Sequence, residues 1–322
     1  MLQLAHISDL HYTEANRARV AALFDVVRRA GIDHLIVTGD LTADAREEHL
    51  IQVRDLLFAS GFRTSAQLTV IPGNHDIFGF IYQTYSKPNA VVKVRTRRDL
   101  LNTIRTLWHF RRRLLAYNDA AYQQDVAAFR AHFVEAYENC LTMRQSPGGF
   151  PFVKLLPDNI ALIGLDTNHL MPRSYNLLRI LRGSRSAMKT WDLTPIGDNL
   201  SGSTGFLDFA TTKAALEMPQ IEGRRKIVVM HHYLYPLPHV EDLTSGVFAR
   251  EMQLRNREEI SALFISHGVD LILHGHWHID DAYQLDGALG PKVLNGGGSL
   301  WSGFNRIEAG ERGLQFKVGM RN

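Results

Sequence analysis

The sequence contains a single cysteine and no long apolar run, and each of these absences excludes a class of protein. With Cys140 alone among 322 residues, neither a disulfide within the chain nor a cysteine cage for a metal can form. No apolar run reaches the roughly 18 residues of a membrane-spanning helix. Met1 to Ser8 enter an apolar strand pattern with no basic segment before it, so we expect no secretory signal and a cytoplasmic location.

The net charge is small, but it is unevenly distributed along the chain. The formal charge is +3, with 36 basic and 33 acidic residues. Residues 85–150 contain 11 Lys and Arg against 5 Asp and Glu, a local charge of +6, and the remainder carries −3. The basic character therefore argues for an anionic partner at one region and against a general affinity for nucleic acid.

Apolar periodicity predicts alternating strands and helices at the start of the chain. Strands are expected at 2–8, 34–38 and 67–71, with helices at 15–30 and 44–60 between them. This order implies a mainly parallel central sheet with right-handed crossovers. Further along, we expect strands at 150–155, 159–165, 226–230 and 269–273, helices at 206–218 and 255–267, and a terminal meander of short strands that forms a second sheet.

The region from about 82 to 146 interrupts this rhythm. Residues 97–117 and 119–141 both have apolar positions at helical spacing, which predicts an inserted helical hairpin. The first of these helices carries most of the arginines of the insert, and a second basic segment follows at 177–182. No repeat, linker or low-complexity tract occurs, so we interpret residues 1–322 as one domain with a basic insert.

Polar side chains follow five of the expected strands, directly after each apolar run. They are Asp9 and His11, then Asp40, then Asn74, His75 and Asp76, then His231, and finally His276 and His278. If these strands share one sheet, their ends converge on one edge. Asp, Asn and His without Cys suit Mn, Fe, Zn or Mg. Two such metals can clamp a phosphate ester, and Asp40, after a central strand, is the natural bridge between them.

Each of these histidines, taken singly, is more often a structural or surface residue, and it is the set of five strand ends that carries the signal. His232 replaces His231 if the strand register shifts by one residue. His274 precedes the Gly-His-x-His motif and fits a packing role. Asp166 also stands at a strand end, where a carboxylate serves either the site or the neighbouring backbone.

These five motifs, in this order, resemble the calcineurin-like metallophosphoesterases over residues 1–80 and about 225–300. The resemblance implies an α/β fold, the four-layer αββα sandwich, and two divalent metals. It implies one metal on Asp9, His11, Asp40 and His278, and the other on Asp40, Asn74, His231 and His276. His75 would face the substrate phosphate, Asp76 would orient His75 or its loop, and a metal-bound hydroxide would attack. Mn²⁺ is the expected metal, with Fe, Zn and Mg as alternatives.

The basic insert suggests the substrate. Asn74, Arg111, Arg112 and Arg179 are candidate substrate-binding residues. Apolar and basic inserts near a phosphate site are similar to the UDP-2,3-diacylglucosamine pyrophosphohydrolases of lipid A synthesis, although those often carry Arg where this chain has His75. We therefore expect a lipid-linked nucleotide, cleaved at the inner face of an anionic membrane. The plainer interpretation is that the insert only packs on the domain with its arginines solvated.

Three alternatives belong to other functional classes. Cyclic-nucleotide phosphodiesterases of the family match Gly-Asn-His-Asp better but do not need the insert. Nucleases of the family would use the arginines against phosphates, yet stacking aromatics are not clearly interleaved with them. A non-enzymatic scaffold is disfavoured because no ligand position is missing. The expected partner is a phosphate ester or diphosphate substrate, and no obligate protein partner is evident.

Overall fold

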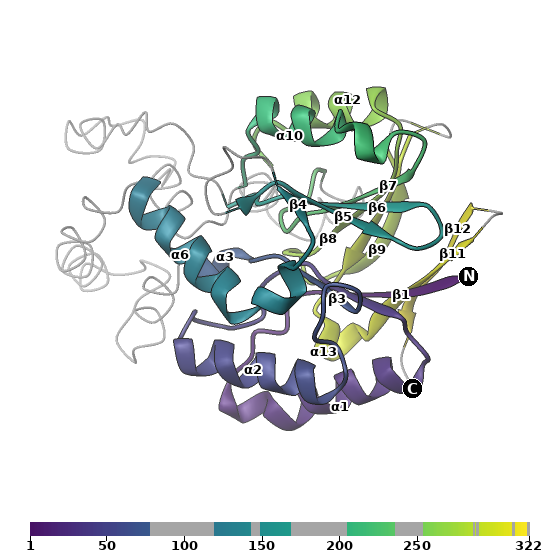
Figure 1. Cartoon of the computed structure of the whole chain (residues 1–322). Coiled ribbons are helices and arrows are strands. Elements are labelled where there is room, and N and C mark those ends of the chain that lie inside the picture. Colours follow the sequence, from purple (N-terminus) through teal and green to yellow (C-terminus); the bar gives the residue numbers. More distant parts are fainter. Residues whose placement is uncertain are drawn as a thin grey trace, which may run out of the picture.

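The computed structural model describes residues 1–77, 119–142, 149–168, 205–235, 254–285, 287, 290–310 and 313–320. Two β-sheets face one another, and helices cover the outer face of each, as Figure 1 shows. This is the four-layer αββα sandwich. Sheets that are covered on both faces have strands made of nearly continuous apolar residues, which describes β2 (His34–Val37) and β6 (Ile160–Gly164).

The first sheet has five strands in the order β12-β11-β1-β2-β3. Its strands are β1 (Leu2–Ile7), β2, β3 (Leu68–Val70), β11 (Phe304–Gly310) and β12 (Gly313–Met320). Strands β1, β2 and β3 are parallel, as the β-α-β-α-β pattern predicts, whereas β11 is antiparallel to β1 and β12 is antiparallel to β11. The carboxyl ends of β1, β2 and β3 therefore lie along one edge of this sheet.

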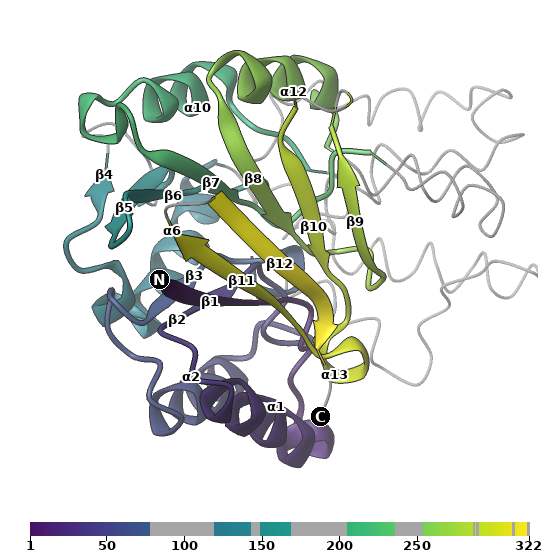
Figure 2. The ribbon, with the colours of Figure 1, turned by 90° about the vertical axis from the view of Figure 1, so that its right-hand side faces the viewer.

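The second sheet has seven strands in the order β4-β5-β6-β7-β8-β10-β9. Besides β6, its strands are β4 (Leu141–Thr142), β5 (Phe152–Leu156), β7 (Arg225–Val229), β8 (Val269–His274), β9 (Asp280–Gln284) and β10 (Lys292–Gly296). The four central strands β6, β7, β8 and β10 are parallel to one another. At the two sides, β5 is antiparallel to β6, β4 to β5 and β9 to β10. Figure 2 shows β11 and β12 in the sheet below β8 and β10.

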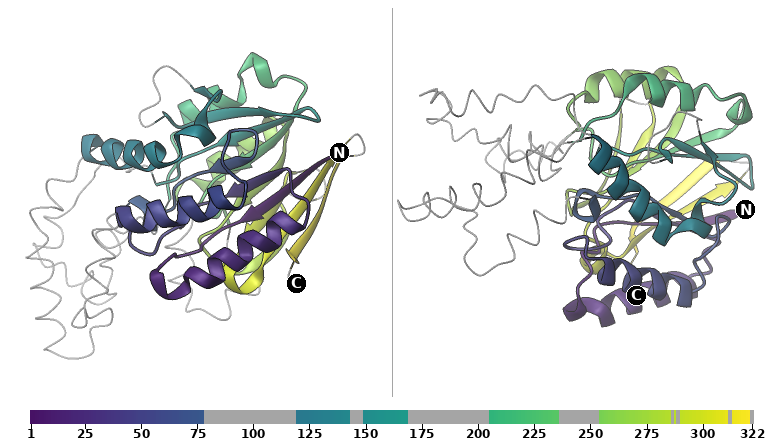
Figure 3. Two further views of the ribbon diagram at one scale, coloured as in Figure 1. Left: turned by 60° about the horizontal axis from the view of Figure 1, so that its bottom comes forward. Right: turned by 60° about the vertical axis from the view of Figure 1, so that its left-hand side comes forward.

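Helices α1 (Arg17–Arg29) and α2 (Glu47–Ala59) cover the first sheet, and α10 (Phe209–Leu216) and α12 (Arg257–Ser266) cover the second. The shorter α3 (Asn74–Ile77) and α13 (Ser299–Ser302) follow β3 and β10. Helix α6 (Asp119–His132) lies at the side of the sandwich, as both views in Figure 3 show. None of the helices described here is long and apolar enough to cross a membrane.

The open edge of the first sheet is closed by side chains from the other parts of the chain. Strand β3 is the edge strand, and its carbonyls at Leu68 and Val70 receive hydrogen bonds from the Lys154 ammonium and the Tyr137 hydroxyl. The ammonium also donates to the carbonyl of Ala136 at 2.9 Å. Unpaired edge carbonyls invite other strands, so these bonds both seal the edge and attach the segment after α6 to it.

Most of the expected elements are confirmed within a few residues, but two expectations are wrong or incomplete. The terminal strands do not form a separate meander, because β9 and β10 extend the second sheet while β11 and β12 complete the first. The expected helix at 119–141 ends at His132, and a short 3-10 turn, Val134–Tyr137, follows it. The other half of the expected hairpin, 97–117, lies outside the described residues.

Candidate metal centre

The five polar strand ends do meet at one edge, but they come from two sheets and not from one. Strands β1, β2 and β3 belong to the first sheet, whereas β7 and β8 belong to the second. Hydrogen bonds join the two groups: the His231 ring Nδ1 lies 2.8 Å from the Thr38 carbonyl, and the backbone N–H of His276 donates to Asp9. The strands therefore do not share one sheet, and convergence arises because the carboxyl ends of both parallel sets point to the same side.

The first cluster consists of Asp9, His11, Asp40 and His278. One ligand atom from each of these residues lies within 4.8 Å of all the others. The Nε2 atoms of His11 and His278 are 2.9 Å apart, and His278 Nε2 is 3.3 Å from Asp9 Oδ1. Asp40 contributes Oδ2, which lies 3.7 Å from His11 Nε2. Four donor atoms thus face a common point.

The second cluster shares Asp40 with the first. It contains Asp40, His231 and His276, again within 4.8 Å of one another. His231 Nε2 lies 3.5 Å from Asp40 Oδ1, 3.1 Å from His276 Nδ1 and 3.0 Å from the Asn74 side-chain oxygen. Because Oδ2 of Asp40 faces the first cluster and Oδ1 faces the second, one carboxylate stands between two groups of donors.

The spacing of these donors fits divalent metals. A metal holds His nitrogens at about 2.1 Å, so two neighbouring ligands in an octahedral shell lie about 3 Å apart. The pairs His11–His278 and His231–His276 have this separation, at 2.9 and 3.1 Å. The Nδ1 proton of His231 is held by the Thr38 carbonyl, so its Nε2 carries the lone pair that a metal needs. The set contains only oxygen and imidazole nitrogen, which leaves the identity of the metal open.

The backbone is strained at the same residues. Asp9, His11, Asp40, His276 and His278 all have positive φ angles, of 54°, 43°, 53°, 73° and 53°. Residues other than glycine rarely adopt this conformation, and such residues concentrate at functional sites. Two glycines of the motifs complete the packing. A Cβ at Gly73 would overlap the carboxylate of Asp40, and one at Gly275 would overlap that of Asp9.

Comparison with known proteins agrees with this geometry. Residues 2–138 match the family model described as calcineurin-like phosphoesterase. The match covers less than half of the chain, which is therefore similar to this family over residues 2–138. The matched segment contains Asp9, His11, Asp40 and the Asn74-His75-Asp76 run, whereas His231, His276 and His278 lie beyond it and are brought to the site by the fold. The match supports a metal-dependent hydrolase of phosphoric esters, and the family implies two divalent metal ions.

The fold is similar to that of solved phosphatases. A dimetal phosphatase from Danio rerio is 14% identical, with a TM-score of 0.53 over 100% of this chain and 99% of that protein. Purple acid phosphatase PPD1 from yellow lupin (Lupinus luteus) seeds is 12% identical, with a TM-score of 0.51 over 100% of this chain and 52% of that protein. At these identities the likeness concerns the fold alone. No curated protein matches the sequence significantly.

Burial makes the ionisation of one carboxylate in the two clusters depend on that of its neighbours. Burial raises the pKa of Asp40 well above its usual range, and the neighbouring charges of Asp9 and Asp76 raise it further. Burial also acts to raise the pKa of Asp9, but the hydrogen bond with His278 and the adjacent histidines outweigh it, so this pKa lies below the usual range. For His11, burial lowers the pKa well below its usual range. Buried carboxylates need a positive partner, and neutral imidazoles offer lone pairs, so a bound cation would stabilise this set of donors.

His75 lies beside the clusters and belongs to neither. Its backbone N–H donates to Asp40 Oδ1 at 2.9 Å, and its ring stands edge-on to that of His11, with centroids 4.5 Å apart. The ring Nδ1 donates to the Ala43 carbonyl at 2.9 Å, so Nε2 carries the lone pair in the neutral ring. Burial lowers the pKa of His75 to about 4. Backbone groups, which a sequence motif does not display, hold this ring in place.

Asp76 binds the loop after β2 to the loop after β3. Its carboxylate accepts hydrogen bonds from the backbone N–H groups of Leu41, Thr42 and Gly73 and from the Thr42 hydroxyl. Burial raises the pKa of Asp76 to about 6, although these hydrogen bonds lower it. Asp40 lies in the first of these loops and Asn74 in the second. The carboxylate therefore orients the loops, one of the two arrangements that the sequence leaves open.

The structure also places the remaining candidate histidines, but not the candidate arginines. His232 is hydrogen bonded to the Thr167 hydroxyl at 2.7 Å, so His231 is the one that faces the clusters. His274 is buried, and its Nδ1 lies 3.2 Å from the Gly275 carbonyl. Arg111, Arg112 and Arg179 lie outside the described residues. The tethering carbonyls of Thr38 and Ala43 were not found from the sequence, and no sequence signal marks them.

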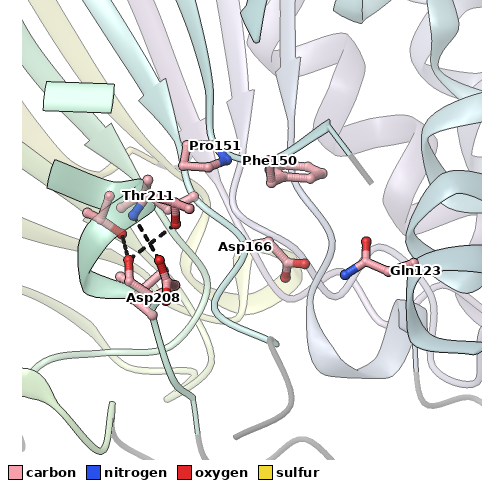
Figure 4. A pocket seen from close by; sticks show the side chains of 9 residues that line it. Gln123, Phe150, Pro151, Asp166, Asp208 and Thr211 are labelled. Atoms are coloured by element: carbon pink, nitrogen blue, oxygen red, sulfur yellow. Dashed lines mark hydrogen bonds between the residues drawn. The ribbon is translucent and has the colours of Figure 1, made fainter. Parts of the chain in front are cut away.

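A cavity of about 230 Å³ lies at the carboxyl end of β6. Phe150, Pro151, Leu165 and Leu207 form its apolar walls, and Figure 4 shows Asp166, Gln123 and Asp208 around it. Asp208 caps α10 by accepting a hydrogen bond from the N–H of Thr211. Asp166 accepts from the Tyr122 hydroxyl and from Asn168, so it has both a side-chain and a backbone partner.

Proposed function

We propose that this chain hydrolyses a phosphodiester or diphosphate bond with two divalent cations that share Asp40. The observation that carries the proposal is the position of that carboxylate, with Oδ2 at 3.7 Å from His11 and Oδ1 at 3.5 Å from His231. A carboxylate that presents a different oxygen to each of two donor clusters is suited to bridge two metals. A single structural metal would need only one cluster.

The proposed ligands are those of the two clusters together with Asn74. Asp9, His11, Asp40 and His278 would hold one cation, and Asp40, Asn74, His231 and His276 the other. When bound, such a pair supplies Lewis-acid polarisation of the phosphoryl group and lowers the pKa of water. The chain's own contribution is orientation: the Thr38 carbonyl fixes the His231 ring, and the strained loops hold Asp9 and Asp40.

His75 is proposed to act on the phosphate. The support is that its backbone N–H donates to Asp40, which both clusters share, and that its ring stands edge-on to that of His11 in the first cluster. A phosphate anion beside the ring would stabilise the protonated form, because opposite charge opposes the effect of burial. The imidazolium would then stabilise the developing negative charge or protonate the leaving oxygen. Asp76 would serve catalysis by holding the loop.

For the substrate we propose a lipid-linked nucleotide such as UDP-2,3-diacylglucosamine, bound at an anionic membrane surface. The support is the charge of +6 in residues 85–150 beside an apolar helical pattern. Arg111, Arg112 and Arg179 are the proposed contacts. Charge reversal of Arg111 and Arg112 should weaken sedimentation with vesicles that contain anionic lipid. Unchanged vesicle binding would return the insert to a packing role.

A turnover screen with purified protein and added Mn²⁺ tests the proposal. The panel is bis-p-nitrophenyl phosphate, the lipid-linked nucleotide, cyclic AMP and single-stranded DNA, each repeated with a chelator and with Mg²⁺, Zn²⁺ or Fe²⁺ in place of Mn²⁺. We expect metal-dependent cleavage of the artificial diester and of the lipid-linked nucleotide. Cleavage of cyclic AMP or DNA in its place would refute the substrate and keep the chemistry. No turnover with any metal would refute the enzyme proposal itself.

A further inference from the structure

An exposed tryptophan stands at the rim of the metal centre. The Trp301 side chain is 59% exposed. The other large apolar side chains that are exposed in the described ranges are aliphatic. Exposure of this much apolar surface to water is unfavourable, and such exposed groups often mark a binding site that a ligand covers. Its neighbour across Gly298 is the proposed ligand His278, whose side chain is 46% exposed.

The contact between this indole and the site follows from Gly298. The position that a Cβ on Gly298 would occupy lies 2.9 Å from the Trp301 ring and 3.6 Å from Cβ of His278. One side of the indole thus lies against Gly298, which also lies close to His278. A flat group attached to a phosphate at the first cluster could reach this ring without displacing a ligand.

The backbone of the helix that carries the indole is held by hydrogen bonds to Ser8. This helix is α13, whose first residue, Ser299, bonds both backbone groups of Ser8: the Ser8 N–H donates to the Ser299 hydroxyl at 2.9 Å, and the Ser299 N–H donates to the Ser8 carbonyl at 3.1 Å. Ser8 directly precedes the proposed ligand Asp9. The short helix that carries Trp301 is therefore tied to the same backbone as the first cluster.

A cation completes the surface. The guanidinium of Arg19 lies over the indole, with Cζ 5.2 Å from the ring centroid, and one of its N–H groups donates to the Leu300 carbonyl at 2.8 Å. Because the indole and the Leu300 carbonyl already hold this guanidinium, the arginine loses little conformational freedom when it binds a ligand. Arginine stacked on an aromatic ring offers a flat face and a positive charge together. Nucleobases stack on such surfaces, and the guanidinium also attracts phosphate.

We infer that Trp301 and Arg19 form a stacking platform for a nucleobase joined to the phosphate that the metal centre attacks. The inference rests on the proposed function, because it places the base relative to that phosphate. It makes Trp301 a specificity residue for nucleotide esters. All three natural substrates under test carry a nucleobase, so the platform is compatible with each of them.

Two esters with the same leaving group isolate the effect of the base. Thymidine 5′-p-nitrophenyl phosphate and ethyl p-nitrophenyl phosphate both release p-nitrophenol, and only the first carries a base. Trp301→Ala should raise KM for the thymidine ester about tenfold more than KM for the ethyl ester, since stacking on an aromatic side chain has an effect of this order. Trp301→Phe should restore most of the difference, and Arg19→Gln should reproduce part of it.

Matched controls come from the same molecule. Val134→Ala removes an apolar side chain that is 61% exposed, on the 3-10 turn after α6, and Arg28→Gln removes a charge near the opposite end of α1 from Arg19. Neither change should alter the ratio of the two KM values. Equal KM changes for both esters in Trp301→Ala, or no change for either, would overturn the platform.

Binding supplies a readout that does not need turnover. The chain has four tryptophans, so the Trp301 signal is the difference between wild type and Trp301→Phe. Uridine 5′-monophosphate should quench that difference in the Mn²⁺-loaded full chain, and ethyl phosphate should not. Quenching without hydrolysis of either ester would refute the proposed function and retain the platform. Hydrolysis without quenching would retain the proposed function and refute the platform. A blue shift of Trp301 with lipid vesicles and no response to nucleotide would assign the indole to a membrane and refute the inference.

Discussion

Asp40 and His231 face one another across the two sheets of the sandwich, with 3.5 Å between Oδ1 of one and Nε2 of the other. Asp40 follows β2 in the five-stranded sheet, and His231 follows β7 in the seven-stranded sheet. A ligand set that is divided in this way exists only while the sheets are packed together. Cation binding and the integrity of the sandwich are therefore linked.

Metal binding should consequently stabilise the fold. A cation that binds the folded chain and not the unfolded chain shifts the unfolding equilibrium by mass action. We expect saturating Mn²⁺ to raise Tm by about 5 °C over the chelator-treated protein, as measured by differential scanning calorimetry. Asp40→Asn should lose most of this shift. The link between sheets and metal would be wrong if the variant kept the full shift.

Metal stoichiometry should distinguish the shared ligand from an unshared one. Asp40 borders both clusters, whereas His278 borders only the first. Elemental analysis should find about two metals per chain in wild type, about one in His278→Gln and fewer than one in Asp40→Asn. Asp25→Asn, an exposed carboxylate on α1, serves as the control and should retain two. Equal losses in His278→Gln and Asp40→Asn would contradict a bridging role.

His75→Ala should separate catalysis from metal binding. The imidazole lies outside both clusters and is held by the Ala43 carbonyl. Loss of a charge-stabilising or proton-donating group should lower kcat roughly 100-fold or more, while metal content stays near that of wild type. His267→Ala, at the end of α12, should leave kcat within twofold of wild type. If His75→Ala lost metal, its assigned role would have to be replaced by that of a ligand.

Lys154 should make stability depend on pH in the alkaline range. Burial lowers the pKa of this lysine from 10.5 to about 8. Between these values the unfolded chain binds the proton and the folded chain does not, so the free energy of unfolding rises with pH. The rise should reach about 3 kcal/mol between pH 8 and 10.5. Urea unfolding at several pH values would measure it, and Lys154→Met should flatten that part of the profile. An unchanged slope would assign the effect to other groups.

The sequence alone determined the donors of the site. Each motif follows a run of buried residues, and a strand that ends in glycine or proline presents its polar side chains locally, so identity and spacing are visible within a few residues. Asp40, Asn74 and His276 are the candidate donors that follow such a glycine. The first three strands and the helices between them were predictable for the same reason, because apolar periodicity is a local property.

The tertiary structure alone decided how these pieces combine. No local pattern states that β11 pairs with β1, about 300 residues away, or that the site joins two sheets. The choice of His231 over His232 depends on a strand register that only the neighbouring strands set. The pairing of Arg19 with Trp301, residues 282 positions apart, is equally invisible in sequence. Such contacts depend on which surfaces pack together, and that selection is made by the whole core.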